Sequence, residues 1–173
     1  MAISKINLKS FKSKAYRKRK ELQKFMNKLQ RKAPAGIDAV AKKLDAETWK
    51  DLDCLACANC CKTMTPTYTK NDVKKIAAFL KITPAQMHEK WLTVDDDNGD
   101  IINKSTPCQF LNKNNKCSVY AVRPADCSGF PHFKKREILD YTHVFNANLH
   151  RCPATLKWVE LMEKNAKELK WVK

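Results

Sequence analysis

The sequence predicts a mostly helical α+β fold with an N-terminal basic helix and one short hairpin. Apolar residues recur at helical spacing in several segments, whereas one pair of short segments flanks a polar turn as hairpin strands do. Eight cysteines lie between residues 54 and 152. Their clustering predicts a small domain in which bound metal cross-links the chain and stabilises a small hydrophobic core.

Composition limits the class of protein. The chain has 173 residues, 43% of them hydrophobic, a length that fits one domain with a modest core. It contains no run of eighteen apolar residues, and the first thirty residues contain no apolar signal core, so we expect no transmembrane segment and a cytoplasmic location. A reducing cytoplasm keeps thiols free as metal ligands or nucleophiles, which argues against a disulfide framework.

The first predicted element is a basic amphipathic helix within residues 1–34. Its apolar stripe consists of Phe11, Ala15, Leu22, Phe25 and Leu29. Pro34 and Gly36 are expected to end the helix. Residues 1–34 hold twelve Lys or Arg against Glu21 alone, a balance of +11 within a formal net charge of +16. We therefore expect a helical extension over residues 1–34 and a cysteine-cluster domain over residues 35–173.

The positive charge of this helix also indicates a class of partner. Phe11, Tyr16 and Phe25 lie among the Lys and Arg residues, a combination found in surfaces that bind RNA or another polyanion. A solvated helix face explains the same charges without a partner. Attachment to a membrane surface is a third interpretation.

Three further helices are expected before the middle of the chain. The first has an apolar face formed by Ile37, Val40, Ala41 and Leu44. The second begins at Thr69, with Asp72 three residues later. The third begins at a capping box of Thr83 and Gln86 and continues to about Trp91.

The remaining elements are turns, the hairpin and a C-terminal helix. Residues 95–100 are expected to form a turn and not a calcium loop, because the first and last ligand positions lack acidic residues. Residues 108–111 and 117–120 flank the polar turn of the hairpin, and proline and glycine around Cys127 predict a rigid loop. A helix is predicted from Pro153. Its apolar stripe consists of Leu156, Val159, Met162, Ala166 and Leu169.

The cysteines are the most informative feature of the chain. Four of them form a CxxCxxCC pattern within eight residues, and four follow at wider spacing. They are Cys54, Cys57, Cys60, Cys61, Cys108, Cys117, Cys127 and Cys152. Buried apolar thiols would not need such clustering, whereas eight thiolates are twice the four that saturate a tetrahedral zinc or hold a cubane iron-sulfur cluster. We predict that all eight are metal ligands, with zinc favoured and an iron-sulfur cluster as the alternative.

The spacing suggests how the ligands divide. Adjacent side chains are expected to diverge, which would assign Cys60 and Cys61 to different ions or give one of them a bridging role. Cys152 opens a helix, whose positive end would stabilise its thiolate. His132 and His150 lie close in sequence to cysteines and are further possible ligands. The cations best placed in sequence to offset the thiolate charge are Lys62, Lys116 and Arg123.

Several blocks of residues together carry a family resemblance. They are the CxxCxxCC block at 54–61, the segment 107–111, the segment 117–120 followed by Arg123, Pro124 and Cys127, and the segment 129–131. This combination resembles the YkgJ-like cysteine-cluster family of zinc- or iron-chelating domains, in which glycine commonly follows the second cysteine where this chain has Ala58. The resemblance implies a metal-chelating domain from residue 54 to about 132, with Cys152 as an eighth ligand and no settled activity.

Three functions remain open at this point. The favoured one is a metal-binding protein whose thiolate-bound ions are required for folding. The alternatives are an iron-sulfur protein of redox or group-transfer chemistry and a nucleic-acid or ribosome-associated protein acting through residues 1–34. The sequence offers no Gly-rich cofactor loop and no convincing general base, which favours a protein that is not an enzyme.

Overall fold

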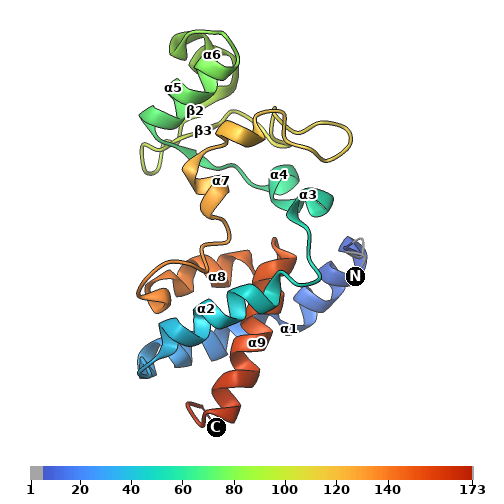
Figure 1. The fold of residues 1–173 in the computed structure, drawn as a ribbon, viewed down its shortest axis with the longest axis vertical. Coiled ribbons are helices and arrows are strands. Elements are labelled where there is room, and N and C mark those ends of the chain that lie inside the picture. Colours follow the sequence, from blue (N-terminus) through green and yellow to red (C-terminus); the bar gives the residue numbers. More distant parts are fainter. Residues whose placement is uncertain (1–5, 173) are drawn as a thin grey trace. The chain divides into compact units, whose positions relative to one another are not determined.

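The computed structural model describes residues 6–172, which form two compact units. Unit 1 comprises residues 1–53 and 131–173, and unit 2 comprises residues 54–130, so unit 2 is inserted in sequence between the two segments of unit 1. Helices dominate the described residues, and a three-stranded antiparallel sheet accompanies them (Figure 1). The predicted mostly helical α+β class is confirmed.

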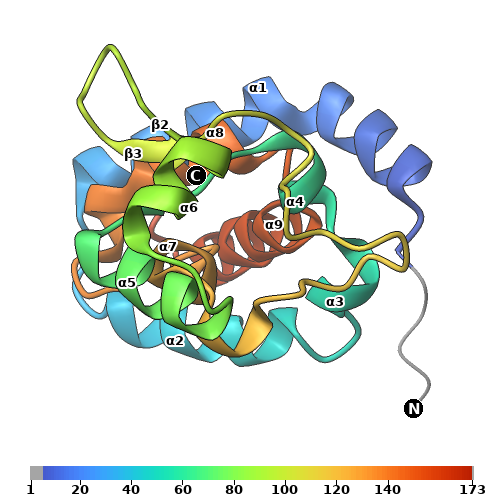
Figure 2. The same cartoon turned by 90° about the horizontal axis from the view of Figure 1, so that it is seen from above.

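Unit 1 is built from helices. They are α1 (Leu8–Lys32), α2 (Ile37–Thr48), the 3-10 helix η2 (Ile138–Tyr141), α8 (Thr142–Asn148) and α9 (Pro153–Glu168). Helix α9 contacts α1, α2 and α8, and it lies between α1 and α2 in Figure 2. Helices η2 and α8 were not predicted, because each is too short to show a recognisable helical repeat of apolar residues.

Helix α1 follows the predicted apolar stripe. All five predicted residues are buried, together with Met26. At its start the Asn7 side chain accepts a hydrogen bond from the Ser10 N–H (3.0 Å), and at its end Ala33 adopts a left-handed conformation (φ 41°) just before Pro34. The helix is thus packed into unit 1 along its apolar face, while the expected boundary after residue 34 stays a prediction.

Aromatic rings form the centre of unit 1. The Trp158 ring of α9 stacks on Phe133 with centroids 4.9 Å apart, and Phe145 lies at the same distance on another side. The Trp158 indole N–H donates to the Ala41 carbonyl of α2 (3.3 Å), so this large ring is buried with its polar atom paired. The predicted stripe of α9 is buried except for Leu169, which caps the helix and is 49% exposed.

Unit 2 combines short helices with the sheet. Its elements are α3 (Cys54–Cys57), α4 (Asn59–Thr63), β1 (Thr67–Tyr68), α5 (Lys70–Phe79), α6 (Pro84–Trp91), β2 (Leu92–Val94), β3 (Ile101–Asn103), the 3-10 helix η1 (Tyr120–Val122) and α7 (Ala125–Gly129). The strand order is β1-β3-β2, with both pairs antiparallel. The capping boxes predicted at Thr69 with Asp72 and at Thr83 with Gln86 are both present.

The turn at residues 95–100 joins β2 and β3, as a turn was predicted there. It is closed by hydrogen bonds from the Asp95 N–H to the Asp100 carbonyl (2.8 Å) and from the Gly99 N–H to the Asp95 carbonyl (2.9 Å). The flanking strands were missed, because each has three residues and β2 follows α6 without a break. The predicted hairpin over 108–120 is present only as a single antiparallel bridge between Leu111 and Cys117.

The core of unit 2 is small. It consists of Tyr68, Val73, Ile76, Ala77, Met87, Leu92, Phe110 and Val119. Two cysteines, Cys108 and Cys117, are partly buried against this core. The apolar core of the unit is therefore continuous with part of the cysteine set.

None of the helices in the described part of the chain combines the length and the apolar character that a membrane span requires.

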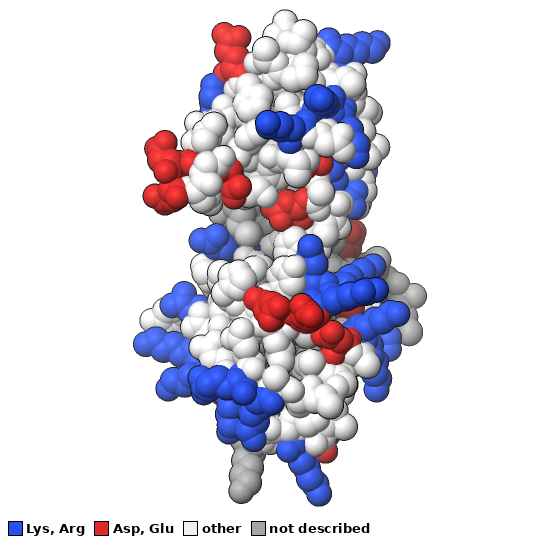
Figure 3. All heavy atoms as spheres, turned by 90° about the vertical axis from the view of Figure 1, so that its left-hand side faces the viewer, with Lys and Arg blue, Asp and Glu red and all other residues white. Residues whose placement is uncertain are grey.

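Figure 3 shows one face of the molecule, where groups of Lys and Arg side chains are interspersed with smaller groups of Asp and Glu.

Candidate metal centre

Seven of the eight cysteines belong to unit 2. Cys54 and Cys57 lie in α3, Cys60 and Cys61 in α4, Cys108 and Cys117 on either side of the polar turn, and Cys127 in α7. The eighth, Cys152, belongs to unit 1. The loop predicted around Cys127 is wrong: residues 125–129 form a helical turn after Pro124, because proline is well tolerated just before a helix.

The CxxCxxCC segment consists of two helical turns separated by one left-handed residue. Buried Ala58 has φ 48°, and its N–H donates to the Cys54 carbonyl (2.9 Å) while its carbonyl accepts from the Lys62 N–H (3.2 Å). A residue with a Cβ pays about 1–2 kcal/mol to adopt this conformation, whereas glycine adopts it freely. This is a physical reason for glycine to be common at this position in the family that the sequence resembles.

The expectation that the adjacent cysteines diverge is wrong. The sulfurs of Cys60 and Cys61, neighbours in α4, lie 3.9 Å apart. The close pair can therefore contribute to one site, while the assignment of these cysteines to particular ions stays a prediction.

Four cysteines from three separate segments lie within electrostatic range of one another. We call them the thiol cluster: Cys61, Cys108, Cys117 and Cys127. The negative charge that each thiolate would carry raises the pKa of its neighbours, and this holds for every pair in the cluster. The backbone helps to join two of the segments, since the Cys108 N–H donates to the Cys61 carbonyl (2.8 Å).

Burial and mutual repulsion keep these thiols neutral in the absence of a cation. The hydrogen bond with Cys60 is the largest cause that raises the pKa of Cys61, followed by burial. Burial is the largest cause that raises the pKa of Cys108 and of Cys117. The pKa of Cys127 is also raised, but Cys127 is an exposed residue, so solvent weakens the effect of its surroundings. A metal ion would supply the positive charge that ionised thiols need at this position.

Other groups in unit 2 act in the opposite direction and favour thiolates. The backbone N–H groups of Phe110 and Val119 hydrogen-bond to the sulfurs of the cysteines two residues earlier, Cys108 and Cys117, and lower their pKa. Hydrogen bonds of this kind stabilise metal-bound sulfur. The cysteines are thus already supplied with donors suited to negative charge.

Two of the three cations predicted to offset thiolate charge do so. Lys62 lowers the pKa of Cys61, and Arg123 lowers that of Cys117. Arg123 is held over the Tyr120 ring at 3.9 Å and donates to the Tyr120 carbonyl (3.0 Å). The corresponding role of Lys116 stays a prediction.

A buried polar network lies beside Cys108. The Tyr68 hydroxyl and the Gln109 amide both donate to Asn103 Oδ1, at 2.6 Å and 3.0 Å. Asn103 Nδ2 has no hydrogen-bond partner within residues 6–172, yet the amide lies close enough to the Cys108 thiol to lower its pKa. Sequence analysis missed this network, because Tyr68 and Asn103 belong to the unpredicted strands β1 and β3; Gln109, within the resembling block 107–111, was its one sequence signal.

Asp72 positions the helix that carries Cys127. Its carboxylate accepts hydrogen bonds from the Thr69 N–H (3.0 Å), the Thr69 hydroxyl (2.6 Å) and the Ala125 N–H at the start of α7 (3.2 Å). Burial tends to raise the pKa of Asp72, but these hydrogen bonds outweigh it and lower the pKa. Asp126, the second residue of α7, accepts a hydrogen bond from the Thr67 N–H of β1 (3.2 Å).

The other predicted ligands have different surroundings. Cys54 is exposed and Cys57 is buried. Cys152 is buried and caps the start of α9, as predicted, with its N–H donating to the Asn148 carbonyl (2.9 Å). His132 is half-buried in unit 1. Desolvation and the positive charges of Arg151 and Arg19 lower the pKa of His150, so its surroundings already oppose a bound cation.

The cysteine side chains of the thiol cluster lie near one another, but their sulfurs are not close enough together to bind one ion. Within residues 6–172, no three His, Cys, Asp or Glu side chains lie close enough together to hold an ion as they stand. The donor set nevertheless fits one class of metal. Four soft sulfurs with N–H donors and nearby cations suit zinc or iron and do not suit magnesium or calcium, which prefer oxygen ligands.

Comparison with known proteins places the chain in a family. No solved structure matches it. An uncharacterized protein of Methanocaldococcus jannaschii, MJ0661, is 36% identical over 76 residues, which are 43% of this chain and 41% of that protein, so the match spans less than half of either. A family model matches residues 53–153, a range that covers more than half of the chain and contains all eight cysteines. The protein therefore belongs to the CxxCxxCC family, whose description is "Putative zinc- or iron-chelating domain".

Proposed function

We propose that this protein holds zinc through cysteine thiolates and that the metal is required for unit 2 to fold. The observation that supports this most directly is the thiol cluster, in which four sulfurs from three segments lie within electrostatic range of one another. An ion bound there would cross-link α4, the segment around residues 108–117 and α7. Structural zinc adds folding free energy for this reason.

The proposed ligand set retains all eight cysteines. The thiol cluster supplies four, and Cys60 lies in contact with one of them. The family match begins one residue before Cys54 and ends one residue after Cys152, which supports including the outermost cysteines. Eight thiolates would complete two four-sulfur sites.

An iron-sulfur cluster is the alternative cofactor, and it would add electron transfer to the structural role. The amide-to-sulfur hydrogen bonds from Phe110 and Val119 would serve such a cluster as well as zinc. A zinc site is colourless and an iron-sulfur cluster is coloured, so the absorption spectrum of one preparation distinguishes the two cofactors.

The test is metal analysis of anaerobically purified full-length protein. Zinc per chain with no visible absorption supports the zinc proposal, whereas iron and sulfide with absorption near about 400 nm support the alternative. Cys127→Ser is expected to lower the bound metal and the melting temperature. Ser128→Ala, at the next position of the same exposed helical turn, is the matched control and is expected to keep both. A Cys127→Ser protein with full metal content and an unchanged melting temperature would contradict the proposal.

A second proposed function is polyanion binding, with RNA as the favoured partner, through α1. The observation in its favour is Tyr16, which is 88% exposed and lies one helical turn from Lys12, Arg19 and Lys20. An exposed ring among cations can stack on a base while the cations contact phosphates. The other two aromatic residues of the sequence argument cannot take part, because Phe11 and Phe25 are each only 7% exposed in the core of unit 1.

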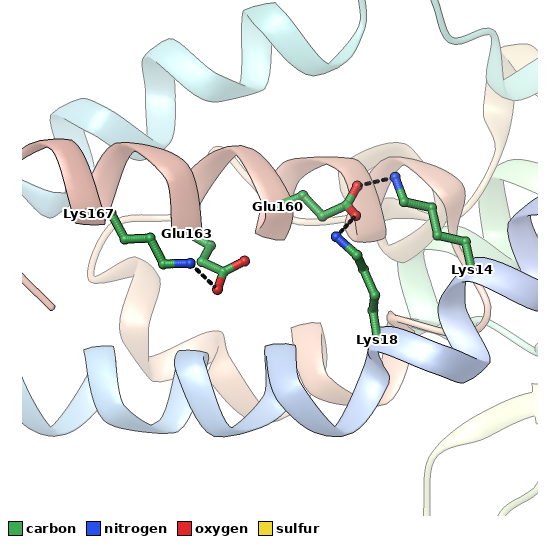
Figure 4. Close-up of polar contacts among 5 residues, drawn as sticks. All are labelled: Lys14, Lys18, Glu160, Glu163 and Lys167. Carbon is green, nitrogen blue, oxygen red and sulfur yellow. Dashed lines mark hydrogen bonds and ion pairs between the residues drawn. The ribbon is translucent and has the colours of Figure 1, made fainter. Parts of the chain in front are cut away.

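Two lysines of α1 have a different role. Lys14 and Lys18 both bind the Glu160 carboxylate of α9, at 2.6 Å and 3.1 Å (Figure 4). The hydrogen bond and negative charge of Glu160 raise the pKa of Lys18. These two cations tie α1 to α9, so we assign the polyanion contact to Lys12, Arg19 and Lys20.

Binding of single-stranded poly(U) at several salt concentrations tests this function. Replacing Lys12, Arg19 and Lys20 by alanine should weaken binding. It should also make the slope of log binding constant against log salt concentration less negative by about 0.7 for each lost phosphate contact. Replacing Lys70, Lys74 and Lys75 by alanine removes the same charge from exposed positions of α5 and is the control. Tyr16→Phe should retain binding that Tyr16→Leu loses. Equal loss in the two triple variants would exclude a specific role for α1.

A further inference from the structure

Asn103 is a buried side chain with one half of its amide unpaired. It ends strand β3 and is 4% exposed. Its oxygen accepts two hydrogen bonds, whereas its Nδ2 is buried and has no hydrogen-bond partner among the described residues. Native proteins rarely leave a buried donor unused, so an unpaired one points to a partner that is completed in another state of the molecule.

The neighbours of Asn103 fix the orientation of its amide. Tyr68 Oη at 2.6 Å and Gln109 Nε2 at 3.0 Å both donate to Oδ1. Rotating the amide by 180° would place its NH₂ group against the NH₂ group of Gln109, which cannot accept. The two donors therefore fix Oδ1 toward themselves and leave Nδ2, at the other end of the planar amide, directed away from them.

The acceptor within reach of that donor is the sulfur of Cys108. The Asn103 side chain lies within reach of the Cys108 thiol, although Nδ2 and the sulfur do not form a hydrogen bond in the present arrangement. Gln109 follows Cys108 directly in the chain, so the same short segment carries both the sulfur and one of the donors that orient Asn103. A neutral thiol is a weak acceptor, whereas a thiolate is a strong one.

We propose that Asn103 is a positioning residue of the metal centre, whose Nδ2 donates a hydrogen bond to the Cys108 sulfur when that sulfur is a metal-bound thiolate. Tyr68 and Gln109 hold the amide in the donating orientation. This inference rests on the proposed metal-binding function. The hydrogen bond fixes the direction of the sulfur and withdraws charge from it, which strengthens retention of the metal and lowers the energy of the sulfur electrons.

Cobalt(II) titration of the anaerobic, metal-free full chain tests the proposal, because cobalt bound to thiolates absorbs light through sulfur-to-metal charge transfer. Asn103→Asp keeps the oxygen that accepts from Tyr68 and Gln109 but removes the donor. We expect it to weaken cobalt affinity about 10- to 100-fold, the range typical of lost outer-shell hydrogen bonds. We also expect the charge-transfer band to move to longer wavelength, a shift that a merely structural role would not produce.

Two further variants make the result decisive. Asn98→Asp introduces the same chemical change in the exposed turn between β2 and β3 and should leave affinity and band position unchanged. Tyr68→Phe removes one orienting donor, keeps the ring in the core, and should shift the band in the same direction by a smaller amount; it decides the question if Asn103→Asp does not fold by circular dichroism.

The outcomes separate this inference from the function on which it rests. If the wild-type chain shows no thiolate-to-cobalt band, both proposals are wrong. If it shows a band that Cys108→Ser weakens, while Asn103→Asp and Tyr68→Phe leave its wavelength and the cobalt affinity unchanged, then metal binding stands and the role of Asn103 is wrong.

Discussion

Unit 1 and unit 2 differ in both charge and core. Unit 1 holds 24 Lys or Arg against 11 Asp or Glu, a balance of +13, whereas unit 2 holds 10 against 7, a balance of +3. Among the described residues, 21 buried hydrophobic residues belong to unit 1 and 10 to unit 2, a larger difference than that between the unit lengths of 96 and 77 residues. Seven of the eight cysteines belong to the unit with the smaller core.

The difference suggests two ways of stabilising one chain. Long helices with wide apolar faces bury enough surface to hold unit 1 together. Unit 2 has two- and three-residue strands and short helices around a small core, so hydrophobic burial alone leaves it marginal. A metal bound by the thiol cluster would supply what its core lacks.

Metal removal is the strongest way to test this comparison. Stripping the metal with a chelator should cost unit 2 on the order of 10 kcal/mol, because thiolate-bound structural metal contributes directly to folding. Hydrogen exchange measured by mass spectrometry should then rise across residues 54–130 and stay low in α1, α2 and α9. Equal protection of both units before and after chelation would contradict the division.

A change in the aromatic centre of unit 1 tests the other side of the comparison. Trp158→Ala should destabilise the protein by about 3–5 kcal/mol, because it removes a fully buried ring that stacks on Phe133. The ion held by the thiol cluster should stay bound, because none of its four cysteines belongs to unit 1. Leu169→Ala, at a half-exposed position, is the control for chemical denaturation. Loss of all bound metal from the Trp158→Ala protein would show that the units do not depend on separate sources of stability.

Asp72 gives a smaller effect with a defined pH dependence. Asp72→Asn should destabilise unit 2 by about 1–3 kcal/mol near neutral pH, since the carboxylate accepts three hydrogen bonds. The folded-state pKa of Asp72 is lowered, so its contribution is fully present above the unfolded pKa of about 3.9 and is lost as the pH falls through the folded pKa. Urea denaturation across this range should show wild type and variant converging in acid. Asp97→Asn, in the exposed turn, is the control and should leave the free energy of unfolding unchanged near neutral pH.

The smallest predicted effect concerns the residue between the two cysteine helices. Ala58→Gly should stabilise unit 2 by up to about 1 kcal/mol, because glycine adopts the left-handed conformation without strain. Ala56→Gly, an exposed position within α3, should instead cost about 0.5–1 kcal/mol. Thermal denaturation of the metal-bound variants measures both. Loss of stability in both variants would mean that the strain at Ala58 is relieved in solution.

Sequence reasoning succeeded where a local rule determines the structure. The α1 stripe and the two capping boxes are set by spacing within one or two helical turns, and the structure confirms them. The same reasoning failed for the sheet, because strands of two or three residues carry no period of their own.

The site was predictable in composition and not in geometry. Cysteine spacing identified the family, while the eight sulfur ligands stay a prediction. The 3.9 Å approach of the Cys60 and Cys61 sulfurs could not be read from the spacing. The position of Asn103 beside Cys108 depends on strand pairing between residues distant in sequence. Such partners can be found only once the strands are known.

The insertion of unit 2 within unit 1 has a consequence for protein synthesis. The first 53 residues cannot complete their unit until residue 131 and its successors have been translated, because α9 contacts both α1 and α2. At about 5–20 residues per second, the 99 residues between Asp53 and the first residue of α9 delay that meeting by roughly 5–20 seconds. During this interval the apolar stripe of α1 has no partner helix on the nascent chain, which makes it a natural substrate for chaperones that act during translation.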